Sequence, residues 1–542
     1  MRTHKIKKVF LVCLLVVTSN IFCRDRDKPS CCTPCSVCLA PISPCQLFPL
    51  YGKTFFLPRS QGVDLPRDMV GTHRFLHRYD GPCYYGALSF TPQYMHSYKD
   101  DRLAENYFAT DILRISGSKN ITRAPEAFLA DYFGLSPTFE STVELHPTVQ
   151  NFVADIGLLG QWKRLWATLH IPIVWTRWNF ELYELICKNQ PFAPYPAKYM
   201  SINELAAPIN SFIRAWQGGV TWGDVKQGLF NNVVGPAQTE SGVADIHLNI
   251  GYDIWLREHG HAGFYARLVA PTGTRSNAHY LFEPVIGNGH HWEMGLGFNG
   301  RVVIWEKDGD QTWSMFFDGY VTHLFASRQC RAFDLRCNCV GSRYMLLKVF
   351  ENNTYTRTLI PAVNITTMPC DVKIDAQLDI VAMFGYECRG FEFDIGYNPW
   401  IRSREIITNL YGCIPENRYG IKGIQNVVDE SDNPSSLTQH CANLHGNFLS
   451  AENQNKLADN PSPRYLTTSD LDVCSAESHM GFTHKLFIYL GYAWATEEQC
   501  TYMPFVGAGF SIEFEGEYPD YTYPNKNCMS QYSVWMKVGT GY

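Results

Sequence analysis

The chain has 542 residues, enough for several soluble domains or for one large β-barrel that grows by adding strands. Charged residues make up only 18%, against roughly 25% in typical soluble domains, and aromatic residues make up 14%. This mixture favours a β protein with aromatic rims. The formal net charge of −6 argues against a basic nucleic-acid-binding surface, so no nucleic-acid partner is expected.

Residues 1–23 predict a secretory signal peptide. A short apolar run at residues 9–17 follows four basic residues: Arg2, Lys5, Lys7 and Lys8. The run is shorter than the roughly 20 residues of a membrane-spanning helix. Removal of this segment takes the formal charge from −6 to −10, because it carries four positive and no negative charges. No later stretch of 18 apolar residues occurs, so a chain of this kind spans a membrane only as a closed barrel.

Residues 24–50 are rich in cysteine. In an intracellular protein this spacing would indicate zinc or iron–sulfur ligation, but behind a signal peptide disulfides are the better interpretation. Three further cysteines lie in a long polar stretch near the C-terminus. The candidates for disulfides are Cys31, Cys32, Cys35, Cys38, Cys45, Cys413, Cys441 and Cys474. Of the 19 cysteines, 17 remain after the signal, and this odd number leaves at least one thiol free or linked to a partner chain.

Residues 51–542 contain many segments in which apolar and polar residues alternate. Alternation with period 2 predicts a strand with one apolar and one wet face. The segments lie near residues 165–175, 244–256, 263–270, 292–304, 313–325, 377–387, 391–398, 486–494 and 506–515. Eleven such residues at about 3.3 Å each, tilted by about 40°, cover roughly 28 Å, which is close to the apolar thickness of an outer membrane. Strands of a soluble sandwich would be shorter.

Two long insertions interrupt this alternation, near residues 179–243 and 402–483. In the first, Ser201 and Glu204 form a capping box ahead of a helical pattern, and Thr221 is suited to cap a second short helix. Such an insertion would be an extracellular loop, an infolded constriction or a lumen plug. The second insertion carries three of the cysteines, and a cystine-braced outer loop is expected there.

The polar faces of the predicted strands would line the lumen if the apolar faces meet lipid. Their residues are Asp245, His247, Asn249, Asp253, Arg267, Glu293, Arg301, Asp379, Glu392, Asp394, Glu513 and Lys537. Seven acids against three bases would mildly favour cations. Each of these residues also has a simpler interpretation, as a solvated group or one paired across strands.

No catalytic motif stands out, so no enzyme activity, cofactor or metal is expected. The sequence lacks a GxSxG elbow, an HExxH pair, a phosphate-binding loop and a Rossmann fingerprint. His259 with His261, and His290 with His291 and Glu293, resemble metal ligands in spacing, but both groups fall at predicted turns where polar residues are ordinary.

The last twelve residues resemble the closing strand of bacterial outer-membrane proteins. One face of this segment carries Tyr532, Val534, Met536, Val538 and Tyr542. The resemblance implies recognition by the barrel-assembly machinery, although Thr540 and Lys537 depart from the usual signal. The cysteine-rich start, CCTPCSVCLAPISPC, resembles the mature N-terminus of chlamydial-type major outer-membrane porins, which implies a disulfide-crosslinked surface porin.

Together these patterns predict an all-β protein, an antiparallel up-and-down transmembrane barrel of about 12–16 strands with long, partly helical loop or plug insertions. The expected location is the bacterial outer membrane, with its lipid bilayer, the assembly machinery and possible disulfide-linked or homo-oligomeric copies as partners. The expected function is a passive porin-like channel or transporter for ions or small solutes. The alternative is a secreted, disulfide-rich β protein acting as an adhesin or structural surface component.

Overall fold

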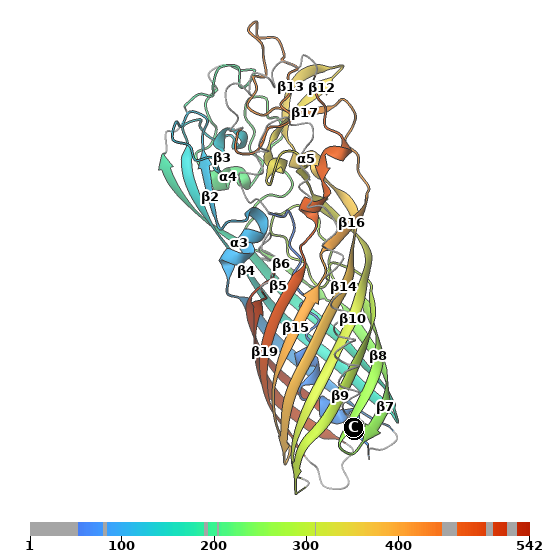
Figure 1. Ribbon diagram of the computed structural model, residues 1–542. Helices are drawn as coiled ribbons and strands as arrows, with labels where there is room; N and C mark the ends of the chain where they lie inside the picture. Colours follow the sequence, from blue (N-terminus) through green and yellow to red (C-terminus); the bar gives the residue numbers. More distant parts are fainter. Residues whose placement is uncertain are drawn as a thin grey trace, which may run out of the picture.

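A computed structural model of the chain describes residues 52–79, 84–188, 193–202, 205–308, 310–446, 463–494, 502–516 and 528–542. The predicted signal peptide and the cysteine-rich segment 24–50 lie outside these residues. The described chain is almost entirely β-structure (Figure 1). Among its described helices, none has both the length and the hydropathy needed to cross a membrane.

Twelve strands pair antiparallel in a closed ring, which confirms the predicted fold class. Each strand pairs with the next in chain order, and the last, β21, pairs with the first, β1. In order around the ring they are β1 (Tyr84–Ser97), β4 (Glu140–Trp162), β5 (Leu165–Lys188), β7 (Ile246–Arg257), β8 (Gly260–Ala270), β9 (Glu293–Lys307), β10 (Gln311–Ala332), β14 (Thr367–Cys388), β15 (Phe391–Arg402), β19 (Gly481–Ala493), β20 (Met503–Glu515) and β21 (Gln531–Gly541).

The two ends of the barrel differ in their connections. At the end that holds the C-terminus, strands are joined by short turns, such as residues 163–164 between β4 and β5 (Figure 1). Arg389 and Gly390 form another of these turns, and both have positive φ, as a two-residue hairpin of type I′ requires. At the other end the connections are long. We call these the turn end and the loop end of the barrel.

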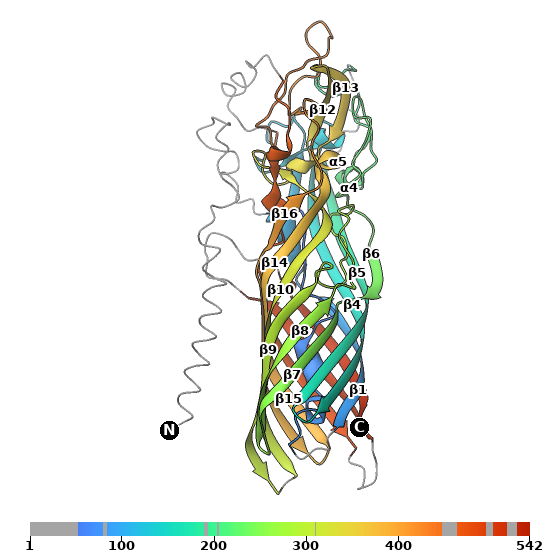
Figure 2. The same ribbon diagram turned by 90° about the vertical axis from the view of Figure 1, so that its right-hand side faces the viewer.

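Four of the twelve barrel strands are much longer than the other eight. β1, β7, β8, β9, β15, β19, β20 and β21 have 11 to 15 residues. β4, β5, β10 and β14 have 22 to 24 residues and continue beyond the others at the loop end (Figure 2). The alternation in the sequence therefore marks only part of each long strand. β10, for example, was expected to end near residue 325 and extends to Ala332.

The remaining elements gather mainly at the loop end, and with the upper parts of the four long strands they form what we call the head (Figure 2). They are α3 (Asp100–Phe108), β2 (Ile112–Ser116), β3 (Phe128–Leu129), η3 (Ala130–Phe133), α4 (Phe212–Trp216), β6 (Gln238–Val243), β11 (Asp334–Leu335), η4 (Ser342–Tyr344), β12 (Leu346–Glu351), β13 (Thr354–Pro361), α5 (Val363–Thr366), β16 (Glu405–Leu410), β17 (Tyr419–Ile421), η5 (Thr468–Asp470), β18 (Leu471–Asp472) and η6 (Val473–Ala476). The largest apolar cluster of the described chain, which includes Phe133, Trp216 and Leu347, lies here.

The predicted insertions belong to the head, with differences in detail. In the first, the helix α4 begins after Ser211, whose side chain accepts a hydrogen bond from the backbone N–H of Arg214. The second helix, predicted after Thr221, is wrong. Trp222 and Val225 pair with each other as an isolated bridge, and Gly223 between them has a positive φ that does not fit a helix.

The segment before the first strand lies inside the barrel. Residues 52–79, which we call the plug, carry the short helices α2 (Leu65–Met69) and η2 (His73–Phe75) and appear in blue within the ring of strands (Figure 1). At its start the backbone N–H of Thr54 donates to the carbonyl of Ser475 in the head, at 2.8 Å. Near its end His77 contacts Asp253, close to the turn end, at 2.9 Å. The plug therefore passes through the barrel from the loop end to the turn end.

Candidate functional site

The site is the interior of the barrel, where the plug meets the inner wall. Outward residues of the strands are apolar and exposed, such as Phe264 (62%) and Leu296 (68%). Inward residues are polar and buried, because the plug covers them. The period-2 geometry of a strand produces this separation, since successive side chains point to opposite faces.

Arg59 is the main contact in the half of the plug nearer the loop end. Its guanidinium lies 2.7 Å from Asp379 on β14 and 3.4 Å from Glu513 on β20. It also donates to the side-chain oxygen of Asn398 at 3.0 Å. All four side chains are buried, so these are charge-assisted hydrogen bonds shielded from solvent.

The middle of the plug is held by charges of both signs. Asp64 forms an ion pair with Lys485 on β19 at 3.1 Å, and Arg67 donates to Gln93 on β1 at 2.8 Å. From β21, the ammonium of Lys537 donates to the backbone carbonyls of Arg67 and Val70. Lys537 therefore pairs with the carbonyl end of α2, whose carbonyls lack helical partners.

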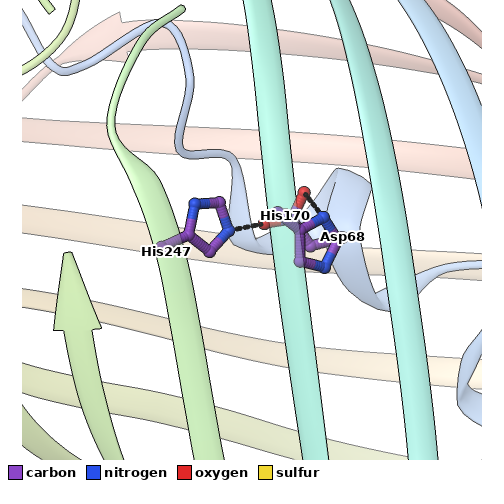
Figure 3. Close-up of side chains that lie close together, drawn as sticks. All are labelled: Asp68, His170 and His247. Carbon is purple, nitrogen blue, oxygen red and sulfur yellow. Dashed lines mark hydrogen bonds and ion pairs between the residues drawn. The ribbon is translucent and has the colours of Figure 1, made fainter. Parts of the chain in front are cut away.

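Asp68 brings two histidines of the wall together (Figure 3). His247 on β7 contacts the carboxylate of Asp68 through Nε2 at 3.1 Å, and His170 on β5 lies 3.7 Å from its other oxygen. The two imidazole rings are stacked, with centroids 4.8 Å apart. His170 also bonds Asp155 on β4 at 2.8 Å, so this cluster joins the plug to three adjacent strands.

A second cluster lies beside the β14–β15 turn. His73 of the plug lies 3.1 Å from Glu392 and 3.4 Å from Asp394, both on β15. Arg74 lies 3.0 Å from the other oxygen of Glu392. Glu387, on β14, lies 3.8 Å from the second imidazole nitrogen of His73. Three carboxylates therefore surround one imidazole near the turn end.

His77 ends the series of plug contacts. Its Nδ1 lies 2.9 Å from Asp253, and its ring stacks on that of His261 on β8 with centroids 3.8 Å apart. Its backbone N–H donates to the side chain of Gln161 at 2.6 Å. His259, on the same hairpin, has an exposed side chain, so the two histidines of this spacing do not converge.

Most of the residues expected to line the lumen contact the plug. Asp379 and Glu513 contact Arg59, and the remaining plug contacts are Asp245 with Ser60, His247 with Asp68, Asp253 with His77, Glu392 and Asp394 with His73, and Lys537 with the backbone of α2. The other four bond within the wall. Arg267 lies 3.5 Å from Glu293 and donates to Asn249 at 3.1 Å. Arg301 donates to Ser314 at 3.0 Å.

Sequence reasoning missed the plug itself and its partners on the early strands. The plug residues are Arg59, Asp64, Arg67, Asp68, His73, Arg74 and His77, and the missed wall residues include Asp155, His170 and Lys485. The sequence does contain a pattern that could have identified the plug. Residues 59–79 combine a high density of charge with a proline and two glycines directly before the first strand, and a polar segment of that kind needs polar surroundings if it is to be enclosed.

The terminal segment is β21, which forms one side of the seam that closes the barrel. β21 pairs with β20 and with β1. Val534, Met536 and Val538 are exposed on the outer face, Tyr532 is half-buried, and Tyr542 is exposed at the turn end.

The cysteines of the head divide into two groups. Cys337, Cys339, Cys441 and Cys474 are each disulfide-bonded. Cys413 is free and exposed, contrary to the expectation for this residue. It follows the end of β16 and faces solvent, whereas Cys441 is buried. The candidates Cys31, Cys32, Cys35, Cys38 and Cys45 lie outside the described residues.

The fold and interior define a closed antiparallel barrel with an internal plug. No protein-family model and no curated relative matches the sequence. Solved structures with some likeness include a Pseudomonas aeruginosa FadL homologue (TM-score 0.28, 7% identity, covering 90% of this chain and 99% of that one) and the TodX deltaS2S3 mutant monoaromatic hydrocarbon channel (0.29, 6%, 85% and 90%). The Escherichia coli outer-membrane protease OmpT is more distant (0.16, 7%, 85% and 95%). At these TM-scores the likeness carries no argument about this chain, and the resemblance to chlamydial-type porins stays a prediction.

Proposed function

We propose that this protein is an outer-membrane channel that passes ions or small polar solutes passively when its plug is displaced. One observation carries the proposal: the closed barrel has an apolar outer wall and a charged inner wall, and a polar plug rests against that inner wall. A barrel that closes on itself leaves no unpaired strand edge, which is the condition for crossing lipid with strands.

The outer wall supports a bilayer location. Exposed apolar side chains surround the barrel on neighbouring strands, among them Ile254, Phe264, Leu296, Leu490 and Met536. A secreted soluble protein would leave this surface in contact with water, at a cost of about 25 cal/mol for each Å² of apolar surface. The bilayer location is therefore favoured over the secreted adhesin.

The ends of the barrel support an orientation. Outer-membrane barrels have short turns on the periplasmic side and long loops outside. By this rule the turn end faces the periplasm and the head faces the surroundings of the cell. The closing strand β21 would be the segment that the barrel-assembly machinery recognises.

The polar contacts of the plug support a gate. Beside an apolar cluster that includes Val63, Leu65 and Phe75 of the plug, they are ion pairs and hydrogen bonds, whose partners water can hydrate once the plug moves. Displacement of the plug removes Arg59 and Arg74 from the interior and leaves Asp379, Glu392 and Glu513 on the wall without those partners. The open barrel would therefore favour cations.

Conductance in planar lipid bilayers tests the proposal. The purified full chain should give discrete current steps, and a KCl gradient should give a reversal potential with the sign of cation preference. Lys485→Met removes the ion-pair partner that Asp64 in the plug shares with Glu513 on the wall, and it should raise the fraction of time that the channel is open. Lys373→Met is the matched control, because Lys373 pairs with Asp375 away from the plug and should change nothing.

The result that would overturn the channel is clear. Folded protein, recognised by heat-modifiable gel mobility, would give no current above that of lipid alone for either the wild type or Lys485→Met, and its proteoliposomes would not swell in small polar solutes. Equal behaviour of Lys485→Met and Lys373→Met in an active channel would instead reject the plug as the gate.

A further inference from the structure

We propose that His73, Glu392 and Asp394 bind one divalent transition-metal ion, which joins the plug to the barrel wall. The three residues each offer one ligand atom, and these atoms all lie within 4.8 Å of one another. The proposal goes beyond transport and does not depend on it, because a metal bridge between plug and wall would exist in a channel or in any other plugged barrel.

The distances suit a tetrahedral ion. Ligand atoms about 2.0–2.2 Å from Zn²⁺ lie about 3.3–3.6 Å from each other in a tetrahedron. In the cluster, Nε2 of His73 lies 3.1 Å from an oxygen of Glu392 and 3.4 Å from an oxygen of Asp394. Adjustments of a few tenths of an ångström would place an ion between them.

Several polar atoms of the cluster are buried without a well-formed hydrogen bond. Apart from the ion-pair contacts within the cluster, both carboxylate oxygens of Asp394 and both imidazole nitrogens of His73 have no partner, and one oxygen of Glu387 is in the same condition. Asp394 is 0% exposed and the side chain of His73 is 6% exposed. Because a buried polar atom without a partner costs about 1–3 kcal/mol, several of them aimed at one point indicate a missing ligand.

The other contacts of the cluster leave room for an ion. Glu392 accepts a hydrogen bond from the backbone N–H of Gly71 at 2.8 Å through the oxygen that faces His73, and Arg74 lies 3.0 Å from its second oxygen. Such bonds hold a ligating carboxylate in orientation. The ring of Phe316 packs against His73 with centroids 4.3 Å apart, which limits the access of water on that side.

The charge balance also favours a cation. Three carboxylates, from Glu387, Glu392 and Asp394, carry −3 when ionised. Arg74 contributes +1, and Arg301 is at the edge of the group, 3.9 Å from Glu387. With the His73 imidazole neutral, as a metal ligand must be, a deficit of one or two positive charges remains, and a divalent ion would supply them. One imidazole with carboxylates is a donor set that Zn²⁺, Co²⁺ and Mn²⁺ accept.

The cluster of Asp68, His170 and His247 provides an internal contrast (Figure 3). Its three residues also lie within ligand distance of one another. There, however, His170 is bonded to Asp155 at 2.8 Å, and His247 is bonded to Asp68 at 3.1 Å and to the carbonyl of Asp245 at 3.2 Å. Protein partners already satisfy this cluster, so we assign it no metal.

The test measures metal binding by the full chain in detergent after treatment with a chelator. Equilibrium dialysis against Zn²⁺ should show one more bound equivalent for the wild type than for Asp394→Asn or His73→Gln, with affinity at the site lowered about 100-fold or more. His247→Gln, in the satisfied cluster, should bind as much Zn²⁺ as the wild type. Heat-modifiable mobility establishes which variants are folded.

Co²⁺ provides a second readout that the wild type alone can give. Bound at nitrogen and oxygen ligands, it should produce visible d–d absorption without a thiolate-to-cobalt charge-transfer band, which separates this site from the cysteine residues. Absence of that absorption in the wild type would overturn the proposal even if a variant failed to fold. So would equal Zn²⁺ stoichiometry in the wild type, Asp394→Asn and His247→Gln.

Discussion

The barrel and the head of this protein place the same kinds of side chain on opposite sides. In the head, apolar residues such as Phe133, Leu347 and Phe350 form a buried core. In the barrel, apolar residues such as Phe264 and Leu296 are exposed, and many charged residues are buried in the interior beside a smaller apolar cluster. One chain thus follows two rules of solvation, because the two parts face different surroundings.

Because of this contrast, an ion pair inside the barrel should contribute more to stability than an ion pair on the outer surface. In the barrel, plug and wall are joined by charged groups that have no bulk water around them, so the loss of one partner leaves an uncompensated charge. On the outer surface, an ion pair competes with water and contributes little. Four predictions separate the two parts, in order of decreasing expected effect.

Arg59→Met should cause the largest loss. Asp379 and Glu513 would remain buried without their shared partner, and breaking a buried ion pair in this way costs about 3–5 kcal/mol. Urea unfolding in lipid vesicles, followed by tryptophan fluorescence, measures the change. Arg389→Met breaks an exposed pair with Asp310 and should leave the unfolding midpoint unchanged. Similar midpoint shifts in the two variants would contradict the contrast.

Leu296→Arg should cause the next largest loss of stability. Leu296 is 68% exposed on β9 and pairs with Ala266 in the middle of β8, so the arginine would face the middle of a bilayer, at a cost of about 2–4 kcal/mol. Leu185 is 69% exposed on the part of β5 that extends into the head, and Leu185→Arg should change stability by no more than about 0.5 kcal/mol. The same unfolding measurement compares them, and equal losses would place both residues in one environment.

Lys348 in the head should make stability depend on pH. Its ammonium lies 2.8–2.9 Å from three backbone carbonyls, and burial lowers its pKa from 10.5 to about 7, while the charge of Asp224 acts in the opposite direction. Between these two values the unfolded chain binds more protons than the folded chain, so the free energy of unfolding should rise with pH by roughly 1 kcal/mol per pH unit. Below about pH 7 both states are protonated and the slope should vanish.

Lys348→Met is the control, and the quantity to compare is the slope of stability against pH rather than the stability itself. Lys348→Met leaves three carbonyls without a donor and is expected to be less stable at every pH, but its curve should lack the rise that Lys348 causes. Parallel curves for the wild type and the variant between pH 7 and 9 would show that Lys348 does not titrate in this range.

Cys413 should give the smallest effect, a change in labelling without a change in stability. It is a free, exposed thiol of the head, so a membrane-impermeant maleimide should label it on intact cells. Cys370 is fully buried, and burial raises the pKa of its thiol to about 12, so it should remain unlabelled. Cys413→Ser should remove one labelled thiol and Cys370→Ser none. Labelling of Cys413 only after cell lysis would reverse the orientation proposed for the barrel.

The sequence predicted the strands of the barrel well where the outer face of a strand meets lipid and the inner face does not. Ten of the twelve strands were expected, because an apolar outer face and a polar inner face alternate strictly at positions such as Ile250 and Asn249. The two missed strands are β1 and β4, which contain Pro92 and Pro147. Proline cannot donate to a strand ladder, so it lowers the sequence signal for a strand, although the alternation of β5 was recognised despite Pro172.

The sequence predicted the head and the plug poorly, for two different physical reasons. Beyond the apolar belt neither face of a strand meets lipid, so β10 continues past residue 325 through Arg328 and Arg331 without alternation. The plug has short helices and irregular backbone, and its order comes from contacts with distant strands, such as Arg59 with Asp379 and Glu513. Local patterns do not carry that information. The inward residues of the strands could be identified from the sequence as polar positions, but the plug residues that they contact could not.

The seam between β1 and β21 has a consequence for the order of assembly. It joins the first and the last strand of the barrel, pairing Ala87 with Gly541, so it needs both ends of the chain to be present. The plug lies upstream of β1 and is surrounded by strands along its length. The plug is therefore either in position before these hydrogen bonds form, or inserted lengthwise into the barrel after they have formed. The segment that leaves the ribosome before any strand is the one that the last pairing encloses.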